Sequence, residues 1–296
     1  MNTLSFEFHS PEQEINDTLF LEKGVRVFVK RDDMIHPFIS GNKWRKLKYT
    51  LQRVRKENKS TLVTFGGAWS NHLLATACAG ATFGFSTIGY VRGDEVHNPV
   101  LALCKLYGME LCFISRDDYR DKPSVFEKRF GLDSAAFFIN EGGYSQEAAQ
   151  GCAEIITELQ QSYDDILCAC GTGATLAGLQ QGISNKTMDM QLHGVPVLKG
   201  GEFIRKEVQQ LGITAQTIKL HTDYHFGGYA KTKPDLLGFI QSFVTQTGIM
   251  IEPTYTGKLF YAAYDLIRQD YFARDTKILL IHTGGLTGFL GMYEKF

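Results

Sequence analysis

Lys43 lies where its amine could act as a nucleophile. It belongs to the segment SGNKWRKL, residues 40–47, in which a glycine-containing turn precedes apolar residues at helical spacing. A lysine in the first turn of a helix experiences the positive end of the helix dipole, and Arg45 and Lys46 add further positive charge. We therefore expect a lowered pKa for Lys43, which would allow its amine to form a Schiff base with a carbonyl group. From these residues alone, three solvated surface cations are the alternative interpretation.

A second pattern predicts a binding site for one phosphate group. The apolar run 166–170 leads into GTGAT, residues 171–175, and then into a predicted helix. Free backbone N–H groups at that helix start, together with two threonine hydroxyls, would bind an anion. A dinucleotide fingerprint needs a third glycine where the chain has Leu176, and a P-loop needs its first glycine where the chain has Glu252. A phosphate monoester fits best, and a tight turn needed only for packing is the alternative.

Ser70, Asn71 and His72 form a polar turn after the glycine pair at 66–67. Ser70 could be a helix cap and nothing more. Asn71 and His72, one step inside the predicted helix, are harder to explain by capping. A reactive lysine, a cradle for one phosphate and this polar turn together describe a site that holds a phosphorylated aldehyde as an imine.

The elements that must position these residues alternate between strand-like and helix-like segments. Strands are expected at 25–29, 61–65, 86–91, 110–114, 136–139, 165–170, 191–197, 217–221 and 277–282. Helices are expected from 43 onward and at 71–81, 98–107, 147–160, 175–181, 203–211, 234–247 and 258–272. This alternation predicts parallel sheet with helices on both faces, and a ligand site at the carboxyl ends of the strands, where the glycine-rich turns fall.

Composition narrows the class of protein. The chain has 296 residues, of which 44% are hydrophobic and 21% charged, with a net charge of −1 and no basic tail. These values argue against nucleic acid or an anionic membrane as a partner. No apolar run has membrane-spanning length and no signal pattern precedes residue 10, so we expect a cytoplasmic enzyme. The six cysteines lack metal-binding spacing and are expected to be reduced, buried thiols, with no metal site.

In these motifs the sequence resembles the fold-type II pyridoxal-phosphate enzymes, in the branch of 1-aminocyclopropane-1-carboxylate (ACC) deaminase and D-cysteine desulfhydrase. The similarity runs in order from RDD at 31–33 to HTGG at 282–285, and its most specific parts are SGNKxRKL and GGxxSNH. It implies two three-layer α/β/α units, each with an open, twisted and mostly parallel sheet, and pyridoxal 5′-phosphate between them. Residues 1–52 and 158–296 would form the larger, cofactor-binding unit and residues 53–157 the smaller one. A homodimer is also implied.

The resemblance assigns cofactor contacts to individual residues. Lys43 would carry the cofactor as a Schiff base, and Lys46 would help to hold its phosphate. Asn71 would bond the phenolic oxygen of the cofactor, and Thr256 would face its pyridine nitrogen. The phosphate loop would comprise Gly171, Thr172, Gly173, Ala174 and Thr175.

The resemblance also places the substrate. Ser70 takes the family's position beside the substrate carboxylate, and Asn71, His72 and Thr283 are expected to line the same pocket. Tyr229, after the glycine pair 227–228, and Tyr255, in EPTYT at 252–256, match the two active-site tyrosines. These tyrosines are expected to assist proton movement, with Lys43 as the expected base.

Two threonines favour one branch over the other. Deaminases of this family carry glutamate where this chain has Thr256, and leucine where it has Thr283. A carboxylate facing the pyridine nitrogen keeps that nitrogen protonated and makes a strong electron sink, whereas a hydroxyl leaves it largely neutral. Cyclopropane opening lacks an easily lost α-proton and needs the stronger sink, but elimination of a thiolate does not. Thr256 therefore favours elimination.

The expected reaction is the conversion of D-cysteine to pyruvate, ammonia and sulfide. ACC deaminase, giving 2-oxobutanoate and ammonia, is the alternative within the family, and so is a lyase for D-serine or another β-substituted amino acid. A non-catalytic cofactor-binding or nucleotide-binding protein is the alternative from a different class.

Overall fold

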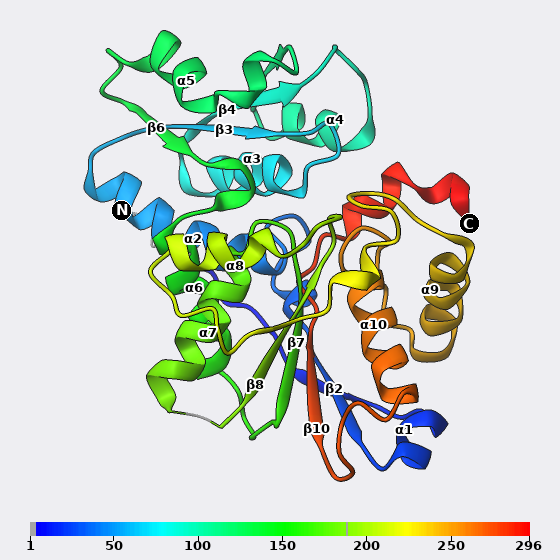
Figure 1. Ribbon diagram of the computed structural model, residues 1–296. Coiled ribbons are helices and arrows are strands. Elements are labelled where there is room, and N and C mark those ends of the chain that lie inside the picture. The colour runs from blue at the N-terminus through cyan, green and yellow to red at the C-terminus, as the bar shows by residue number, and fades with distance from the viewer. Residues whose placement is uncertain (1–3, 188) are drawn as a thin grey trace.

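The computed structural model describes residues 4–187 and 189–296, and within these ranges the strands form two sheets (Figure 1). The larger sheet has the order β1-β2-β10-β7-β8-β9. Its strands are β1 (Glu12–Ile15), β2 (Arg26–Lys30), β10 (Lys277–Ile281), β7 (Asp165–Cys170), β8 (Gln191–Pro196) and β9 (Lys219–Leu220). Only the β1–β2 pair among them is antiparallel. The carboxyl ends of the five parallel strands therefore share one edge.

The smaller sheet is parallel throughout the described strands and has the order β5-β4-β3-β6. Its strands are β5 (Glu110–Ile114), β4 (Ser86–Arg92), β3 (Thr61–Gly66) and β6 (Ala136–Ile139). Helices α3 (Asn71–Phe83), α4 (Pro99–Leu106) and α5 (Lys122–Phe130) belong to the same part of the chain. Figure 1 shows this unit above the larger sheet, with α2 (Asn42–Lys56) between them.

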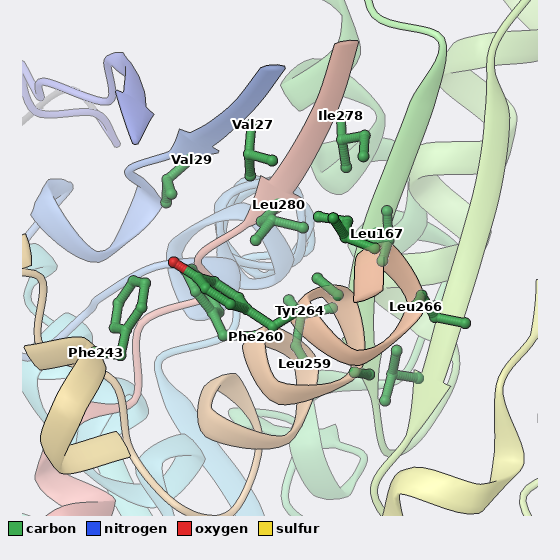
Figure 2. Packing of buried hydrophobic residues seen from close by; sticks show 14 of the residues in the cluster. Val27, Val29, Leu167, Phe243, Leu259, Phe260, Tyr264, Leu266, Ile278 and Leu280 are labelled. Carbon is green, nitrogen blue, oxygen red and sulfur yellow. The ribbon is translucent and has the colours of Figure 1, made fainter. Parts of the chain in front are cut away.

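Side chains that point alternately to the two faces of the central strands contribute to two hydrophobic cores. Ile278 and Leu280 of β10 pack with α9 (Pro234–Thr247) and α10 (Thr256–Arg268), as Figure 2 shows for part of this cluster. Leu279 and Ile281 pack on the opposite face with α6 (Gln146–Thr157), α7 (Ala174–Lys186) and α8 (Phe203–Gln210). Because successive side chains of a strand point to opposite faces, a continuous apolar strand is expected where both faces are covered. The predicted α/β architecture of a fold-type II enzyme is thus present.

Helices α2, α6 and α7 pack unusually closely because glycines lie at their contacts. A β-carbon on Gly151 of α6 would lie 1.9 Å from the carbonyl oxygen of Arg45 in α2. A β-carbon on Gly178 of α7 would lie 2.4 Å from the carbonyl oxygen of Ala149 in α6. This close packing fixes α2, and with it Lys43, relative to the larger sheet.

Most predicted elements occur where the sequence pattern indicated. The strands β5, β6 and β7 and the helix α9 have the expected bounds. The helix α1 (Thr18–Lys23), the antiparallel strand β1 and the helix α5 were not predicted, and β9 has two residues instead of five. The division of the chain at residues 53 and 157 stays a prediction.

Two expectations about composition can be compared with the structure. All six cysteines are free thiols, five of them buried and Cys112 partly exposed. Among residues 4–187 and 189–296, no helix is both long and apolar enough to span a lipid bilayer.

Candidate active site

The turn before Lys43 is seated on the carboxyl end of β10. Gly41 has φ 58°, and a β-carbon there would lie 2.0 Å from the carbonyl oxygen of Thr283. The Asn42 N–H donates to that same oxygen at 3.2 Å, and the Gly285 N–H donates to Ser40 Oγ at 3.2 Å. A left-handed backbone with so close an approach requires glycine. The structure therefore brings the lysine segment and the late HTGG segment into direct contact.

Lys43 is the second residue of α2, and its side chain is partly buried. The pKa of Lys43 is lowered from 10.5 to about 7, mainly by burial and next by the positive charge of Lys46. The direction agrees with the sequence prediction, but burial is the larger cause. About half of the Lys43 amines are therefore neutral near pH 7 and available as nucleophile or base.

Arg45 does not act as predicted. Its side chain is fully buried, and its guanidinium group pairs with Asp32 at 3.0 Å and with Glu158 at 2.5 Å. Its positive charge is compensated by these carboxylates, so the expectation that Arg45 lowers the pKa of Lys43 is corrected. Because Arg45 and Lys46 are both buried, the alternative of three solvated surface cations is also wrong.

Lys46 is a buried cation that borders the predicted phosphate loop. Its Nζ donates to the carbonyl oxygen of Gly142 at 3.2 Å, which uses one of three N–H donors. A β-carbon on Gly142 would lie 3.3 Å from the Thr172 side chain. The backbone at Gly142 therefore contacts Lys46 and also lies next to the loop. Burial lowers the pKa of Lys46. An anion bound beside it would compensate the buried charge.

The loop 171–175 ends at the uncapped start of α7. Gly173 has φ 82°, and within the described ranges no side chain caps the helix, so its first N–H groups remain for a ligand. Thr175 is buried, and its hydroxyl accepts a hydrogen bond from Asn42 Nδ2 at 3.1 Å. These donors, together with Lys46, fit one phosphate group. A phosphate group would therefore fit between the starts of α2 and α7.

His72 has a single defined tautomer in this environment. The Thr64 hydroxyl donates to the Ile139 carbonyl oxygen at 2.9 Å, so it must accept from His72 Nε2–H at 2.8 Å. Nδ1 is then a bare acceptor, and within the described part of the chain it has no hydrogen-bond partner. Burial and the positive charges of Lys43 and Lys46 hold the pKa of His72 well below 6.5. His72 thus offers the site a neutral acceptor rather than a proton donor.

Ser70 and Asn71 begin helix α3 at the carboxyl end of β3. The Ser70 Oγ accepts from the Leu73 N–H at 3.3 Å, so the capping role considered for Ser70 is present. Asn71 Nδ2 donates to the Gly285 carbonyl oxygen at 3.2 Å, and Asn71 Oδ1 accepts from the Thr287 hydroxyl at 2.5 Å. Asn71 therefore connects the smaller unit to the segment that follows β10.

Thr256 is fully buried at the start of α10 and is bonded to Glu252. The Glu252 N–H donates to Thr256 Oγ1 at 2.8 Å, while the Glu252 carboxylate accepts the N–H groups of residues 254–256 at 2.7–2.9 Å. Burial raises the pKa of Glu252, although these three N–H bonds oppose the rise. The carboxylate of this region therefore belongs to Glu252, which lies next to Thr256, and residue 256 itself supplies a hydroxyl group.

Tyr255 and Tyr229 lie together beside the phosphate loop. A β-carbon on Gly171 would lie 3.2 Å from the Tyr255 ring, and the two tyrosine ring centroids are 5.9 Å apart at 74°. Tyr229 is 48% exposed, which places it toward solvent. Burial raises the pKa of both hydroxyls above the ordinary value. Both are protonated at neutral pH and can donate hydrogen bonds.

Sequence reasoning missed two residues that the structure places here. Glu252 entered only as a mismatch to a phosphate-binding motif and as part of EPTYT at 252–256, and its carboxylate was given no role. Thr287 lies in the 3-10 helix Leu286–Gly291. Its contact with Asn71 joins residues 216 positions apart, for which no local pattern exists.

The chain is similar to known proteins along most of its length. The family model for pyridoxal-phosphate dependent enzymes matches residues 17–284. The chain is 33% identical to a putative ACC deaminase of Pyrococcus horikoshii, covering 93% of this chain and 89% of that one. It is 29% identical to the bifunctional D-cysteine desulfhydrase/ACC deaminase of Arabidopsis thaliana, covering 93% and 75%. A crystal structure of an ACC deaminase homologue superposes with a TM-score of 0.87, 30% identity and coverage of 99% and 94%. The chain therefore belongs to the family of pyridoxal-phosphate dependent enzymes.

Proposed function

We propose that the protein is a pyridoxal-phosphate dependent lyase that converts D-cysteine to pyruvate, ammonia and sulfide. The observation that carries this choice is the buried Thr256 hydroxyl at the start of α10. Its oxygen accepts the Glu252 N–H at 2.8 Å, and its own proton makes only long contacts of 3.4 Å, with the Glu252 carbonyl and carboxylate oxygens. A pyridine nitrogen at a shorter distance would take that proton as a hydrogen bond in their place. A neutral hydroxyl donor there supports a moderate electron sink, which suffices when a good leaving group departs from the β-carbon.

When bound, the cofactor withdraws electrons from the α-carbon of the amino acid. Lys46 and the N–H groups at the start of α7 would hold its phosphate, and Asn71 would donate to its phenolic oxygen. Lys43, with its pKa of about 7, takes the α-proton as a neutral amine. The C–S bond then breaks and its electron pair leaves with sulfur as sulfide. The released unsaturated amine hydrolyses with one water to pyruvate and ammonia.

Substrate orientation is assigned to the polar turn at the start of α3. The family resemblance gives Ser70 the position beside the substrate carboxylate, and the unpartnered Nδ1 of neutral His72 would supply an acceptor nearby. Tyr229 and Tyr255 remain protonated and supply donors on the side of the phosphate loop. Thr283, whose backbone carbonyl lies against Gly41, would line the substrate pocket near Lys43.

ACC deaminase is the second candidate, because the deaminase name is carried by the Pyrococcus horikoshii relative and, in part, by the Arabidopsis thaliana relative. Against it stand Thr256 and Thr283, which occupy the positions of glutamate and leucine in the deaminases of the family. A cytoplasmic homodimer remains our expectation for the assembly.

The test is a product assay on the cofactor-loaded protein. It is incubated separately with D-cysteine, L-cysteine and ACC, and pyruvate, sulfide and 2-oxobutanoate are measured. We expect sulfide and pyruvate in equal amounts from D-cysteine. Substantial 2-oxobutanoate from ACC, without sulfide from D-cysteine, would overturn the choice of reaction. Lys43→Ala should remove the yellow absorbance of the loaded protein, whereas Lys48→Ala on the same helix should retain it.

A further inference from the structure

We propose that Thr287 is a positioning residue that fixes the amide of Asn71 for the cofactor. The inference rests on the proposed role of Asn71 as the donor to the phenolic oxygen. Thr287 lies in the 3-10 helix after β10, far from Asn71 in sequence. Nothing in its position along the chain connects it with the cofactor, so the assignment depends on its contact in the fold.

Two partners leave the Asn71 amide only one orientation. Its Nδ2 faces the Gly285 carbonyl oxygen at 3.2 Å, and its Oδ1 faces the Thr287 hydroxyl at 2.5 Å. Rotating the amide by half a turn would place Oδ1 against the Gly285 carbonyl, where two acceptors repel each other. The Thr287 hydroxyl adds a donor to Oδ1 and removes the freedom to tilt away.

This orientation determines what Asn71 can offer a ligand. One Nδ2 hydrogen is used by the Gly285 carbonyl, and the second is free to donate. A donor at the phenolic oxygen stabilises that oxygen in its deprotonated form, whereas a carbonyl oxygen in its place would disfavour it. Thr287 would therefore influence the protonation of the bound cofactor without touching it.

The surrounding glycines keep space open beside this amide. A β-carbon on Gly285 would lie 2.8 Å from Asn71 Nδ2. A β-carbon on Gly288 would lie 3.6 Å from the same atom and 3.5 Å from Glu252 Oε2. The segment that carries Thr287 is thus close to both Asn71 and Glu252. A side chain at Gly285 or Gly288 would occupy the space beside the Asn71 amide.

The experiment compares Thr287→Val, Thr287→Ser and Asn71→Ala. Valine keeps the shape of threonine without the hydroxyl, and serine restores the donor. Each protein is freed of cofactor and titrated with pyridoxal 5′-phosphate, to measure the dissociation constant and the ratio of the absorbance bands of the protonated and deprotonated forms. Thermal unfolding of the cofactor-free proteins is measured alongside.

We expect Thr287→Val to weaken cofactor binding by about two- to tenfold, the loss of one modest hydrogen bond, and to shift the bands toward the protonated phenol. Thr287→Ser should restore both readouts. If Thr287→Val lowers only thermal stability while Asn71→Ala changes the affinity and bands, Thr287 is merely structural and the inference is overturned. If Asn71→Ala changes neither readout, the role of Asn71 itself is refuted, and the inference with it.

Discussion

Removing the charge of Lys46 should raise the pKa of Lys43 in the cofactor-free protein. Burial alone would keep that pKa lowered, and Lys46 is the next largest cause. Side chains three residues apart on a helix start about 5–6 Å apart, and two charges about 6–8 Å apart interact by roughly 2–3 kcal/mol at an effective dielectric constant of about 20. This corresponds to about 1.5–2 pKa units, so the pKa should rise from about 7 but stay below its ordinary 10.5.

The consequence for reactivity is large. With a pKa of about 7, half of the Lys43 amines are neutral at pH 7. An increase of about 1.5–2 units would leave only roughly 1–3% neutral at that pH. Lys46→Met should therefore shift the pH midpoint of Lys43 modification upward and slow the modification strongly at pH 7.

The assay is the rate of acylation of Lys43 against pH, followed by mass spectrometry of the peptide that contains it. Lys48→Met is the matched control, because Lys48 lies on the same helix but pairs with Glu154 at 2.7 Å. An unchanged midpoint in Lys46→Met would refute the electrostatic reasoning. An equal shift in Lys48→Met would show that the effect is not specific to Lys46.

Two further predictions concern stability, each measured by urea unfolding. Arg45→Met removes one partner of the fully buried Arg45–Asp32 ion pair and should lower the free energy of unfolding by about 3–5 kcal/mol. Breaking the more exposed Lys48–Glu154 pair should lower it by less than about 1 kcal/mol. Equal losses in the two variants would contradict the argument from burial. Gly151→Ala should lower the free energy of unfolding by about 1–3 kcal/mol, because the alanine β-carbon would lie 1.9 Å from the Arg45 carbonyl oxygen. Gly238 lies in α9, and a β-carbon added there would have no atom within 4 Å, so Gly238→Ala should stabilise the protein by about 0.5–1 kcal/mol. If Gly238→Ala destabilised the protein as well, the close contact at Gly151 would not explain the effect of Gly151→Ala.

The sequence predicted the site best where local pattern and fold agree. The apolar strand β7 followed by GTGAT predicts the strand, the turn and the start of α7, because a buried parallel strand and a glycine turn are local features. The start of α10 was predicted at residue 258 and lies at 256, because the Glu252 carboxylate satisfies the N–H groups of residues 254–256. A buried glutamate is rare, so its presence in the core is not a reasonable prediction from sequence.

Other differences come from tertiary contacts. The pairing of Arg45 with Asp32 and Glu158 joins three distant segments, so no local rule distinguishes Arg45 from its neighbour Lys46. The tautomer of His72 depends on Thr64, whose own proton is committed to Ile139 across the smaller sheet. The residue types indicated which chemistry is possible, whereas the charge compensation of Arg45 and the tautomer of His72 could be assigned only from contacts in the folded structure.

The position of β10 has a consequence for how the protein is made. This strand is the last of the chain among the described strands, yet it lies in the middle of the larger sheet, between β2 and β7. During synthesis the antiparallel pair β1–β2 and the later pair β7–β8 therefore have no common neighbour until residues 277–281 have left the ribosome. The smaller sheet uses only residues 61–139 and can pair its strands earlier. Lys43 is translated long before Thr283, so the contact of its turn with the Thr283 carbonyl oxygen is completed only after β10 has been made.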